Sequence, residues 1–231
     1  MTAQPAGCSP LVRFVGAART YGSGLTAVVA LHDANGAVYP GEHIALMGPS
    51  GSGKTTLLHL LAGRDTPTAG QLTWPAIGDR DSLRPGPLGV VFQSPSLLPA
   101  LDVVENVALP LLLAHVHADE ARQRALDALD TLDLGLLSGK LPEELSGGQA
   151  QRVAIARVLA SRPRLILADE PTGQLDHDTA THVIDALLEA ATSSGAGLVV
   201  NTHDPIIADR FPTHWTMADG RLHLGATTCS A

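Results

Sequence analysis

The sequence predicts an α/β protein, in which helices cover a parallel sheet, a β-rich region precedes it and a helical subdomain is inserted into it. Short apolar runs with the composition of buried strands alternate with helical segments, which is the pattern of a parallel sheet with both faces covered. A stretch of helical periodicity from about residue 96 to residue 160 interrupts this alternation and indicates an insertion. The length of 231 residues suits one domain with such a subdomain.

The first part of the chain is expected to supply strands, one helix and a long loop. Residues 1–41 mix short apolar runs with Gly and Asn turns and predict a small β-rich region. Residues 43–47 (HIALM) predict a buried strand, and residues 54–62 predict a helix that Gly63 ends. Residues 64–87 are rich in Pro, Gly and Asp and are expected to be mainly loop.

The rest of the chain is expected to continue the alternation of strands and helices. Three short apolar runs predict buried strands, at residues 88–92, 165–168 and 198–201. Three longer segments predict helices, at residues 119–134, 147–161 and 179–191. The first two of these helices lie within the insertion.

Composition excludes some classes of protein and indicates a cytosolic location. The formal net charge is −8, and because nucleic-acid phosphates repel an acidic chain, nucleic-acid binding is a poor first interpretation. Cys8 and Cys229 are expected to be free thiols in a reducing compartment. No run of about 18 apolar residues predicts a membrane span, and the N-terminus does not resemble a secretion signal. The chain is therefore expected in the cytosol unless another protein holds it at a membrane.

A glycine-rich stretch, GPSGSGKT at residues 48–55, fits the phosphate-binding pattern GxxxxGK[ST] in full. A strand precedes it and a helix follows, as the pattern requires; its backbone N–H groups and the helix N-terminus favour phosphate oxygens. Lys54 is expected to contact the β- and γ-phosphates of ATP, and Thr55 to place its hydroxyl on Mg²⁺. The expected nucleotide-binding residues of this loop are Gly48, Pro49, Ser50, Gly51, Ser52, Gly53, Lys54, Thr55 and Thr56.

Two acidic residues, Asp169 and Glu170, end the predicted strand at 165–168. A carboxylate in the position of Asp169 can hold Mg²⁺, usually through water. The adjacent Glu170 can accept a proton from an attacking water. Downstream of a phosphate-binding loop, this pair indicates nucleotide hydrolysis.

The run LSGGQ at residues 145–149, followed by AQRVAIAR, predicts a second phosphate site. Ser146 can cap the next helix, and Gly147 and Gly148 leave backbone N–H groups open to an anion. This run resembles the signature motif of the ABC ATPases, and the resemblance covers nearly the whole chain. The motifs follow the order of that family: GPSGSGKT, Gln93, LSGGQ, LILADE, Asp176 and His203.

The resemblance implies the ABC ATPase fold, a P-loop NTPase core with an antiparallel β subdomain and an inserted helical subdomain. Residues 1–231 are then a single ABC ATPase domain. Residues 1–93 and 161–231 are expected to form the RecA-like core and the β subdomain. Residues 94–160 are expected to form the helical subdomain that carries the signature motif.

The resemblance also implies roles for residues outside the phosphate-binding loop. Gln93 looks like the glutamine that senses Mg²⁺ and the attacking water, and His203 like the switch histidine at the γ-phosphate. Tyr21 stands in the place of the aromatic residue that stacks on adenine, with core packing as its alternative role. Asp176 matches the aspartate that links the two sites of a dimer. The signature of each subunit faces the ATP of the other, through Ser146, Gly147, Gly148 and Gln149.

The function implied is that of an ATP-hydrolysing subunit of an ABC transporter, which powers a separate membrane subunit through ATP-driven head-to-tail dimerisation. Its partners are a second ATPase subunit, expected to be a copy of this chain, and a transmembrane permease that holds it on the cytoplasmic face of the membrane; no nucleic acid is expected. ATP and Mg²⁺ are required. The expected catalytic residues are Glu170, His203 and Gln93, and the expected Mg²⁺ ligands are Thr55, Gln93 and Asp169.

Three phrases are typical of the branch that includes the lipoprotein-release, macrolide-export and cell-division ATPases: VFQSPSLLP, ENV and ADEPTG. Gln174 departs from this branch, which usually has Asn there. An alternative role is regulation of a membrane complex in cell-wall remodelling without transport. Import and export both agree with these motifs. A DNA-repair ATPase would need a long coiled-coil insertion, and a tandem translation factor would need two cassettes; the sequence has neither.

Overall fold

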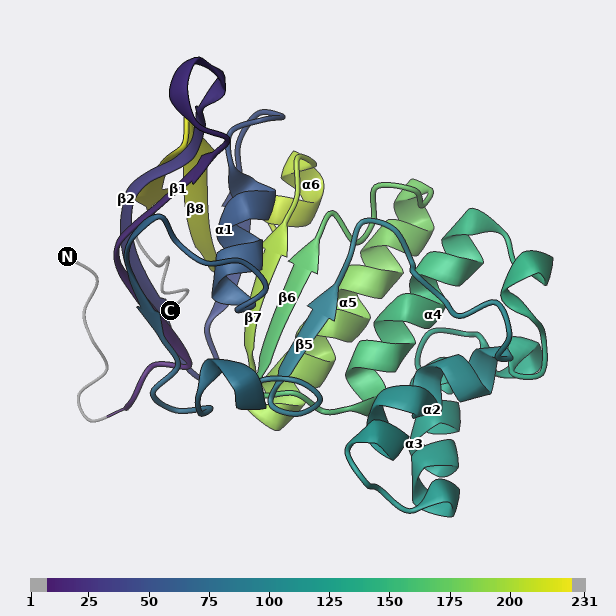
Figure 1. Ribbon diagram of the computed structural model, residues 1–231. Helices are drawn as coiled ribbons and strands as arrows, with labels where there is room; N and C mark the ends of the chain where they lie inside the picture. The colour runs from purple at the N-terminus through teal and green to yellow at the C-terminus, as the bar shows by residue number, and fades with distance from the viewer. Residues whose placement is uncertain (1–7, 226–231) are drawn as a thin grey trace.

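The computed structural model describes residues 8–225 and has two sheets with helices on both sides of the larger one (Figure 1). The larger sheet has the strand order β5-β6-β7-β3-β8-β9, and the smaller, antiparallel sheet has the order β2-β1-β4. The strands are β1 (Val12–Tyr21), β2 (Val28–Val38), β3 (His43–Met47), β4 (Ala69–Thr73), β5 (Leu88–Val91), β6 (Leu165–Asp169), β7 (Gly197–Asn201), β8 (Thr213–Ala218) and β9 (Arg221–Leu224).

Helices separate most of these strands along the chain. The α-helices are α1 (Lys54–Leu61), α2 (Val103–Leu113), α3 (Ala118–Asp130), α4 (Gly147–Ala160), α5 (His177–Ser194) and α6 (Pro205–Ala208). Short 3₁₀ turns lie at Gly24–Thr26, Arg80–Ser82, Gly135–Leu137 and Pro142–Glu144. The arrangement confirms the predicted α/β fold with an antiparallel β region and a helical region.

Both faces of the larger sheet are buried because side chains alternate between them along each strand. In β6, Leu165 and Leu167 belong to the core that α1 shares with the antiparallel sheet, whereas Ile166 and Ala168 belong to the core that α4 and α5 share. The same alternation places Asp169, the last residue of β6, on the α1 face of the sheet. The apolar runs without polar alternation are thus what a sheet covered on both sides requires.

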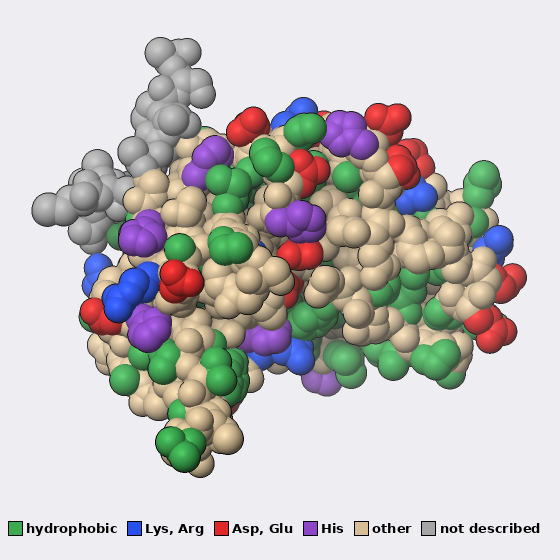
Figure 2. Space-filling model, turned by 90° about the horizontal axis from the view of Figure 1, so that it is seen from above, with side chains coloured by type: hydrophobic (Ala, Val, Ile, Leu, Met, Phe, Trp, Pro, Cys, Tyr) green, Lys and Arg blue, Asp and Glu red, His purple; other side chains and the backbone are tan. Residues whose placement is uncertain are grey.

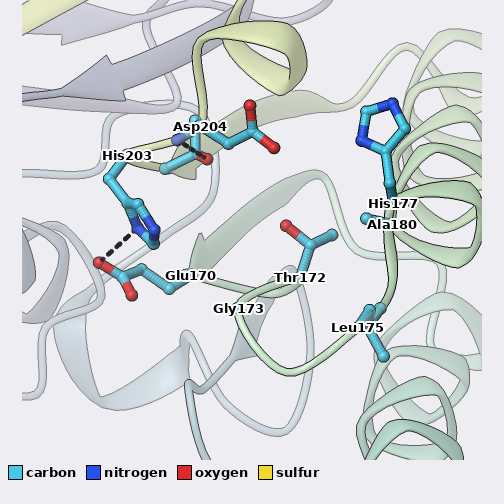
Figure 3. Close-up of a pocket in the computed structure, with 9 residues that line it drawn as sticks. Glu170, Thr172, Gly173, Leu175, His177, Ala180, His203 and Asp204 are labelled. Atoms are coloured by element: carbon cyan, nitrogen blue, oxygen red, sulfur yellow. Dashed lines mark hydrogen bonds and ion pairs between the residues drawn. The ribbon is translucent and has the colours of Figure 1, made fainter.

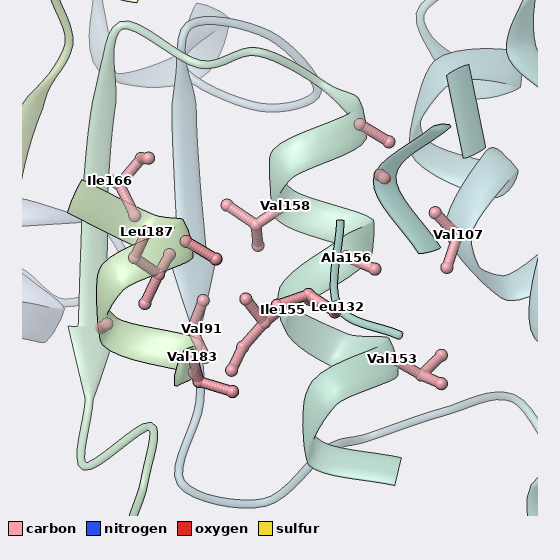
Figure 4. Packing of buried hydrophobic residues seen from close by; sticks show 14 of the residues in the cluster. Val91, Val107, Leu132, Val153, Ile155, Ala156, Val158, Ile166, Val183 and Leu187 are labelled. Atoms are coloured by element: carbon pink, nitrogen blue, oxygen red, sulfur yellow. The ribbon is translucent and has the colours of Figure 1, made fainter. Parts of the chain in front are cut away.

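Helix α4 joins the helical region to the sheet because two of its faces are apolar. Figure 4 shows Ile155 and Val158 on the side that faces β5, β6 and α5, and Val153 on the side that faces Val107 of α2. Ile155 and Val153 are fully buried. The helix is therefore packed on two sides, and a movement of α2 and α3 against it would disturb a continuous core.

The predicted strands at 43–47, 88–92, 165–168 and 198–201 all form, to within a residue at each end. The predicted helix at 54–62 is α1, and the predicted helix at 147–161 is α4. The helix predicted at 179–191 is longer, because Asp176 caps its N-terminus and Gly195 ends it in the left-handed conformation. Residues 94–160 contain α2, α3 and α4.

The expectation that residues 64–87 are mainly loop was wrong for β4. Of its five residues, all are exposed except the half-buried Leu72, so the segment has no apolar alternation to predict a strand. Backbone pairing with β1 forms it instead, as Arg13 opposite Thr73 and Phe14 opposite Leu72. It is the edge strand of the smaller sheet, so its backbone pairs with a neighbouring strand on one side only.

Two further segments differ from the expectation. The helix predicted to reach residue 134 ends at Asp130, because the apolar spacing continues into a turn whose Leu132 and Leu134 are fully buried. Residues beyond Asn201 had no predicted element, yet they form α6, β8 and β9. In β8, Thr213, Trp215 and Met217 are buried and their neighbours are not, which is the alternation of a half-covered strand.

Of the two cysteines, one lies within the described residues. Cys8 is exposed and free. Cys229 lies outside the described residues. Within residues 8–225, no helix has both the length and the apolar content needed to cross a bilayer.

Burial of α4 between the sheet and the helical region predicts a large stability effect. Replacing the fully buried Ile155 in Ile155→Ala should lower the free energy of unfolding by about 2–5 kcal/mol, because it removes apolar contacts and leaves a cavity. The measurement is urea unfolding followed by circular dichroism. The matched control is Ile206→Ala, where the isoleucine is 57% exposed and the change should be small. Equal losses in the two variants would contradict this packing.

Candidate active site

The glycine-rich loop between β3 and α1 is tightly curved, and at two of its positions only glycine fits. Gly48 has φ of 149°, and a Cβ atom there would lie 2.2 Å from the Met217 carbonyl oxygen. Gly53 has φ of 100°, and its Cβ atom would lie 2.2 Å from the Ala30 carbonyl oxygen. Side chains at either position would therefore clash with backbone, and the loop keeps its curvature because both positions lack them.

Lys54 begins α1 and bends back over this loop. It is buried, and its Nζ donates hydrogen bonds to the carbonyl oxygens of Gly48 at 2.8 Å and Pro49 at 2.9 Å. Beside it is a cavity of about 300 Å³. The cavity is lined by Ala30, Ser50, Gly51, Gly53, Lys54, Thr55, Thr56, Gln93, Glu170 and Asn201. The structure thus brings six residues of the predicted phosphate-binding loop together with Gln93 and Glu170.

Asp169 lies at the end of β6, where its carboxylate faces α1. Its Oδ1 accepts a hydrogen bond from Thr55 Oγ1 at 3.2 Å and another from Asn201 Nδ2. Asp169 and Asn201 are opposite each other in the parallel pairing of β6 with β7. The predicted Mg²⁺ ligands Thr55 and Asp169 are therefore in contact.

Glu170 occupies a strained backbone position directly after the strand. Its φ is 45°, in the left-handed region that residues other than glycine rarely adopt. Its N–H donates to the Asn201 carbonyl oxygen at 3.0 Å, and its own carbonyl accepts from Gly173 N–H at 3.2 Å. Such strain costs about 1–3 kcal/mol and is typical of functional sites.

The Glu170 side chain connects the other two predicted catalytic residues. Gln93 Nε2 donates to Glu170 Oε2 at 3.4 Å, and His203 Nδ1 lies 3.5 Å from Glu170 Oε1. Figure 3 shows His203 and Glu170 pointing toward each other across the edge of a cavity of about 240 Å³. His177 at the start of α5 lines the same cavity from another side (Figure 3). Gln93 and His203 are 110 positions apart in the sequence, and both contact the Glu170 carboxylate.

Figure 2 views the molecule from above, the side toward which the arrows of β5, β6 and β7 point in Figure 1. Histidine and acidic side chains lie next to each other near the middle of this face (Figure 2). Ligands of open parallel sheets bind outside the carboxyl ends of the strands. The face is thus the one on which a ligand is expected.

The signature residues lie apart from this cavity, at the N-terminus of α4. Ser146 caps the helix: its Oγ accepts from Gln149 N–H at 3.2 Å, while Gln149 Oε1 accepts from Ser146 N–H at 2.9 Å. A Cβ atom on Gly148 would lie 3.1 Å from Leu175, so the signature packs against the segment that follows Glu170. None of the signature residues lines the cavity beside Lys54 in the part of the chain that the structure describes.

Asp176 caps the N-terminus of α5. Its carboxylate accepts from the Thr179 N–H at 3.0 Å and from the Thr179 hydroxyl at 2.7 Å. These two bonds, the backbone one first, hold the pKa of Asp176 below its usual value. A structural role is therefore present at this position whether or not a second subunit contacts it.

Tyr21 ends β1 and is 39% exposed, so it is not a core residue. Its hydroxyl donates to Asp65 Oδ2 at 2.8 Å, and the Arg19 guanidinium lies 4.6 Å from the ring centroid. Arg19 also pairs with Asp65 at 2.8 Å. Desolvation raises the pKa of Asp65, but the Thr66 N–H, the Tyr21 hydroxyl and Arg19 together hold it below its usual value. The core-packing alternative for Tyr21 was wrong.

Sequence reasoning missed three residues that support the site. Asn201 contacts Asp169, as described above. Gln151 Nε2 of α4 donates to the Phe92 carbonyl at 3.0 Å, directly before Gln93. Arg157, also on α4, donates to the carbonyls of Pro95 and Ser96, and burial lowers its pKa. The signal was a polar residue within an otherwise apolar pattern, as Asn201 is after Leu-Val-Val.

A phosphate-binding loop, an acidic pair at the end of β6 and a second helix N-terminus suited to an anion, on a helical insertion, define a nucleotide hydrolase of the ATP-binding cassette class. A sequence profile of the family described as "ABC transporter" matches residues 31–173. The chain belongs to this family and is an ATPase subunit of it.

Curated relatives cover almost the same length. The lipoprotein-releasing system ATP-binding protein LolD of Legionella pneumophila (strain Paris) is 42% identical over 212 residues, which cover 89% of this chain and 93% of the relative. LolD of Pseudomonas syringae pv. tomato is 43% identical over 212 residues, 88% and 93% of the two chains. These relatives confirm the branch that the phrases around Gln93 and Asp169 indicated.

Solved structures have the same fold. The ATP-binding cassette MJ0796, solved as a dimer in a post-hydrolysis state bound to ADP and Pi, is 35% identical and matches with a TM-score of 0.87 over 95% of this chain and 100% of that chain. CbiO1 from Clostridium perfringens, part of the cbiONQ transporter complex, is 27% identical and matches with a TM-score of 0.78 over 95% and 89%. The family binds ATP or ADP at this fold.

The position of Lys54 predicts its effect on nucleotide binding. In Lys54→Ala, ATP affinity measured by calorimetry should fall sharply, because Lys54 supplies the one ammonium group that residues 8–225 place on the cavity. Lys140→Ala is the matched control: it removes the same charge from a turn before the signature and should leave affinity unchanged. Unaltered affinity in Lys54→Ala would contradict the assignment of the phosphate-binding loop.

Proposed function

We propose that this chain hydrolyses ATP at a site completed by a second copy of itself, and that closure of the two copies drives a separate membrane subunit. The observation that carries this proposal is the meeting of Gln93, Glu170 and His203 beside the phosphate-binding loop. The relatives are named for lipoprotein release and match nearly the full length of the chain. Release of lipoproteins from a membrane is therefore the proposed task of the complex.

ATP binding would use the loop at residues 48–56 and Tyr21. Lys54 would exchange its bonds to the loop carbonyls for bonds to the β- and γ-phosphates, and the N–H groups of α1 would add partial positive charge. Adenine would stack on the face of Tyr21 that Arg19 does not cover. The Asp65 contact holds the ring in place for this purpose.

The residues at the end of β6 fit Mg²⁺. Hydroxyl and carboxylate oxygens are ligands that Mg²⁺ prefers, and here Thr55 Oγ1 and Asp169 Oδ1 are in direct contact. Gln93, which lines the same cavity as Thr55, would add an amide oxygen. When bound, Mg²⁺ would neutralise phosphate charge.

The hydrolytic step requires a base next to the γ-phosphate. A water oxygen bonds to the γ-phosphorus while the bond from that phosphorus to the β–γ bridging oxygen breaks, and Glu170 takes the proton of the water. Gln93 and His203 already contact the Glu170 carboxylate, so both can orient it and the water. His203 would donate to the γ-phosphate oxygen, and Lys54 would stabilise the charge on the product.

A second copy would supply the signature. One chain has two anion-binding helix N-termini, at α1 and α4, and they do not share a cavity in the described residues. A head-to-tail pair would place Ser146, Gly147, Gly148 and Gln149 of each copy on the ATP of the other. Asp176 would then lie near the boundary between the copies, and the related cassette MJ0796 was solved as a dimer.

The membrane subunit would dock on the helical region. Exposed leucines lie there, including Leu98 after Gln93 and Leu112 and Leu113 at the end of α2. A groove of about 250 Å³ between α2 and α3 is lined largely by apolar residues, among them Leu109 and Leu112. Gln151 and Arg157 tie the backbone on either side of Gln93 to α4, so force applied there would reach the signature.

The test of the hydrolytic site is Glu170→Gln, which keeps size and shape but cannot accept the proton. The rate should fall by about 10²–10⁴, while ATP still binds because Lys54, Thr55 and Asp169 are unchanged. ATP that binds only the closed pair favours it by mass action, so the variant should accumulate as an ATP-dependent dimer. Size-exclusion chromatography with light scattering, in ATP and in ADP, measures this.

Two further results check the same experiment. Adding Ser146→Arg to Glu170→Gln should abolish the dimer, because a bulky side chain blocks the signature. A Glu170→Gln protein that remains monomeric in saturating ATP, alone and with its membrane subunit, would refute the shared site. So would hydrolysis at the unaltered rate.

The proposed docking surface predicts how the chain reaches a membrane. The purified chain should not bind protein-free lipid vesicles and should sediment with membranes only when its membrane subunit is present. Leu112→Glu, which places a charge in the exposed groove, should weaken this co-sedimentation, whereas Leu224→Glu on β9 should not. Binding of the chain to vesicles alone would rule out attachment through a partner.

A further inference from the structure

Asn201 is a buried polar residue at the end of an apolar strand, and the mechanism above gives it no role. It is 1% exposed and follows Leu198, Val199 and Val200 in β7. The alternation along β7 places it on the α1 face of the sheet, where its neighbours in the paired strands are Leu46 and Asp169. A primary amide at such a place is costly to bury unless both of its ends are hydrogen-bonded.

Only one end of the Asn201 amide is bonded. Its Nδ2 donates to Asp169 Oδ1, but its Oδ1 has no hydrogen-bond partner among residues 8–225. The contact with Asp169 fixes which end is which, because an ionised carboxylate only accepts and must be met by the NH₂ group. An unsatisfied acceptor therefore remains beside the Asp169 carboxylate.

A second buried asparagine shows what a purely structural role looks like in this chain. Asn106 is 0% exposed, and its Oδ1 accepts from Leu98 N–H while its Nδ2 donates to the carbonyls of Leu98, Leu101 and Asp102. Both ends of that amide are satisfied by the protein. Asn201 differs because its acceptor is left over and because it lines the cavity beside Lys54 and Thr55.

The chemistry of Asn201 Oδ1, the atom without a partner among residues 8–225, determines which groups can bind to it. Oδ1 is an acceptor, so phosphate oxygens, which are also acceptors, cannot satisfy it. Oδ1 is buried as the structure stands, so a water molecule can donate to it only if metal binding opens space beside it; Mg²⁺ at phosphate sites keeps several waters, one of which would be that donor. The attacking water is less suited, because Glu170 contacts Gln93 and His203 through its side chain and Asn201 only through the backbone.

We propose that Asn201 is a positioning residue of the Mg²⁺ site: its NH₂ group holds Asp169 toward Thr55, and its Oδ1 accepts a hydrogen bond from a Mg²⁺-bound water. Two donors, Thr55 Oγ1 and Asn201 Nδ2, meet on the same Asp169 oxygen, which orients the carboxylate between them. Partners of this kind orient metal ligands and strengthen metal binding. The inference rests on the proposed function, because it concerns the metal that accompanies ATP.

The test uses Asn201→Leu, which keeps the approximate volume and removes both amide functions. Mn²⁺ serves as the probe, and its affinity for the complex of the full chain with a non-hydrolysable ATP analogue is measured by electron paramagnetic resonance. Loss of a residue that supports metal ligands typically weakens metal affinity by about 10–100-fold, and we expect that range here. Affinity for the analogue in EDTA, measured by calorimetry, should be unchanged because Lys54 and the loop are intact.

Two more variants make the result specific. Asn201→Ala adds no atoms, so it cannot clash, and it should weaken Mn²⁺ binding in the same direction if the leucine variant fails to fold. Val200→Ala is the matched control: it perturbs the same strand on its other face and should leave Mn²⁺ affinity unchanged. Thermal unfolding of each variant verifies that it is folded.

Each outcome decides the proposal. Weaker Mn²⁺ binding in both Asn201 variants, with unchanged analogue affinity in EDTA, supports it. Unchanged Mn²⁺ affinity overturns it, even if the hydrolysis rate falls, since that result would assign Asn201 to the attacking water. An equal loss of analogue affinity with and without metal overturns it in favour of a structural role. Failure of the unaltered chain to bind the analogue at all would instead refute the proposed function.

Discussion

The parallel pairing of β7 with both β3 and β6 is the constraint on which the site depends. It brings the strand that leads into the phosphate-binding loop, the strand that ends in Asp169 and the strand that ends in Asn201 to one edge of the sheet. Because the register sets Asp169 opposite Asn201, and alternation turns both toward α1, their side chains meet Thr55. A shift of one residue would turn Asp169 to the opposite face and separate it from Thr55.

Helix α4 supplies the second constraint, since it connects the signature to the other motifs. Its N-terminus carries Ser146, while Gln151 and Arg157 along its length hold the backbone on either side of Gln93. Ile155 on the same helix is buried against the sheet core. A displacement of the segment after Gln93 is therefore opposed by hydrogen bonds and by packing, and it is transmitted to α4 as a rigid element.

Most of the fold and the residues of the site could be predicted because their signals are local. The apolar runs at β3, β6 and β7 and the glycine-rich loop each lie within a few consecutive residues. Strand β4 could not be predicted, since backbone pairing with β1 forms it without an apolar pattern. Asn201 and the Asp65 contact of Tyr21 depend on which strands and loops become neighbours, which spacing along the chain does not encode.

The strained backbone of Glu170 explains why so many hydrogen bonds and side-chain contacts surround this residue. With φ of 45°, the residue would relax if only the chain on either side held it. Pairing of its N–H with Asn201 and of its carbonyl with Gly173 fixes the turn, and Gln93 and His203 fix the carboxylate. The turn directs Glu170 out of the β6 alternation while Asp169 stays within it. Two consecutive acidic residues can therefore serve two tasks, one toward the metal and one toward the water, without sharing a position.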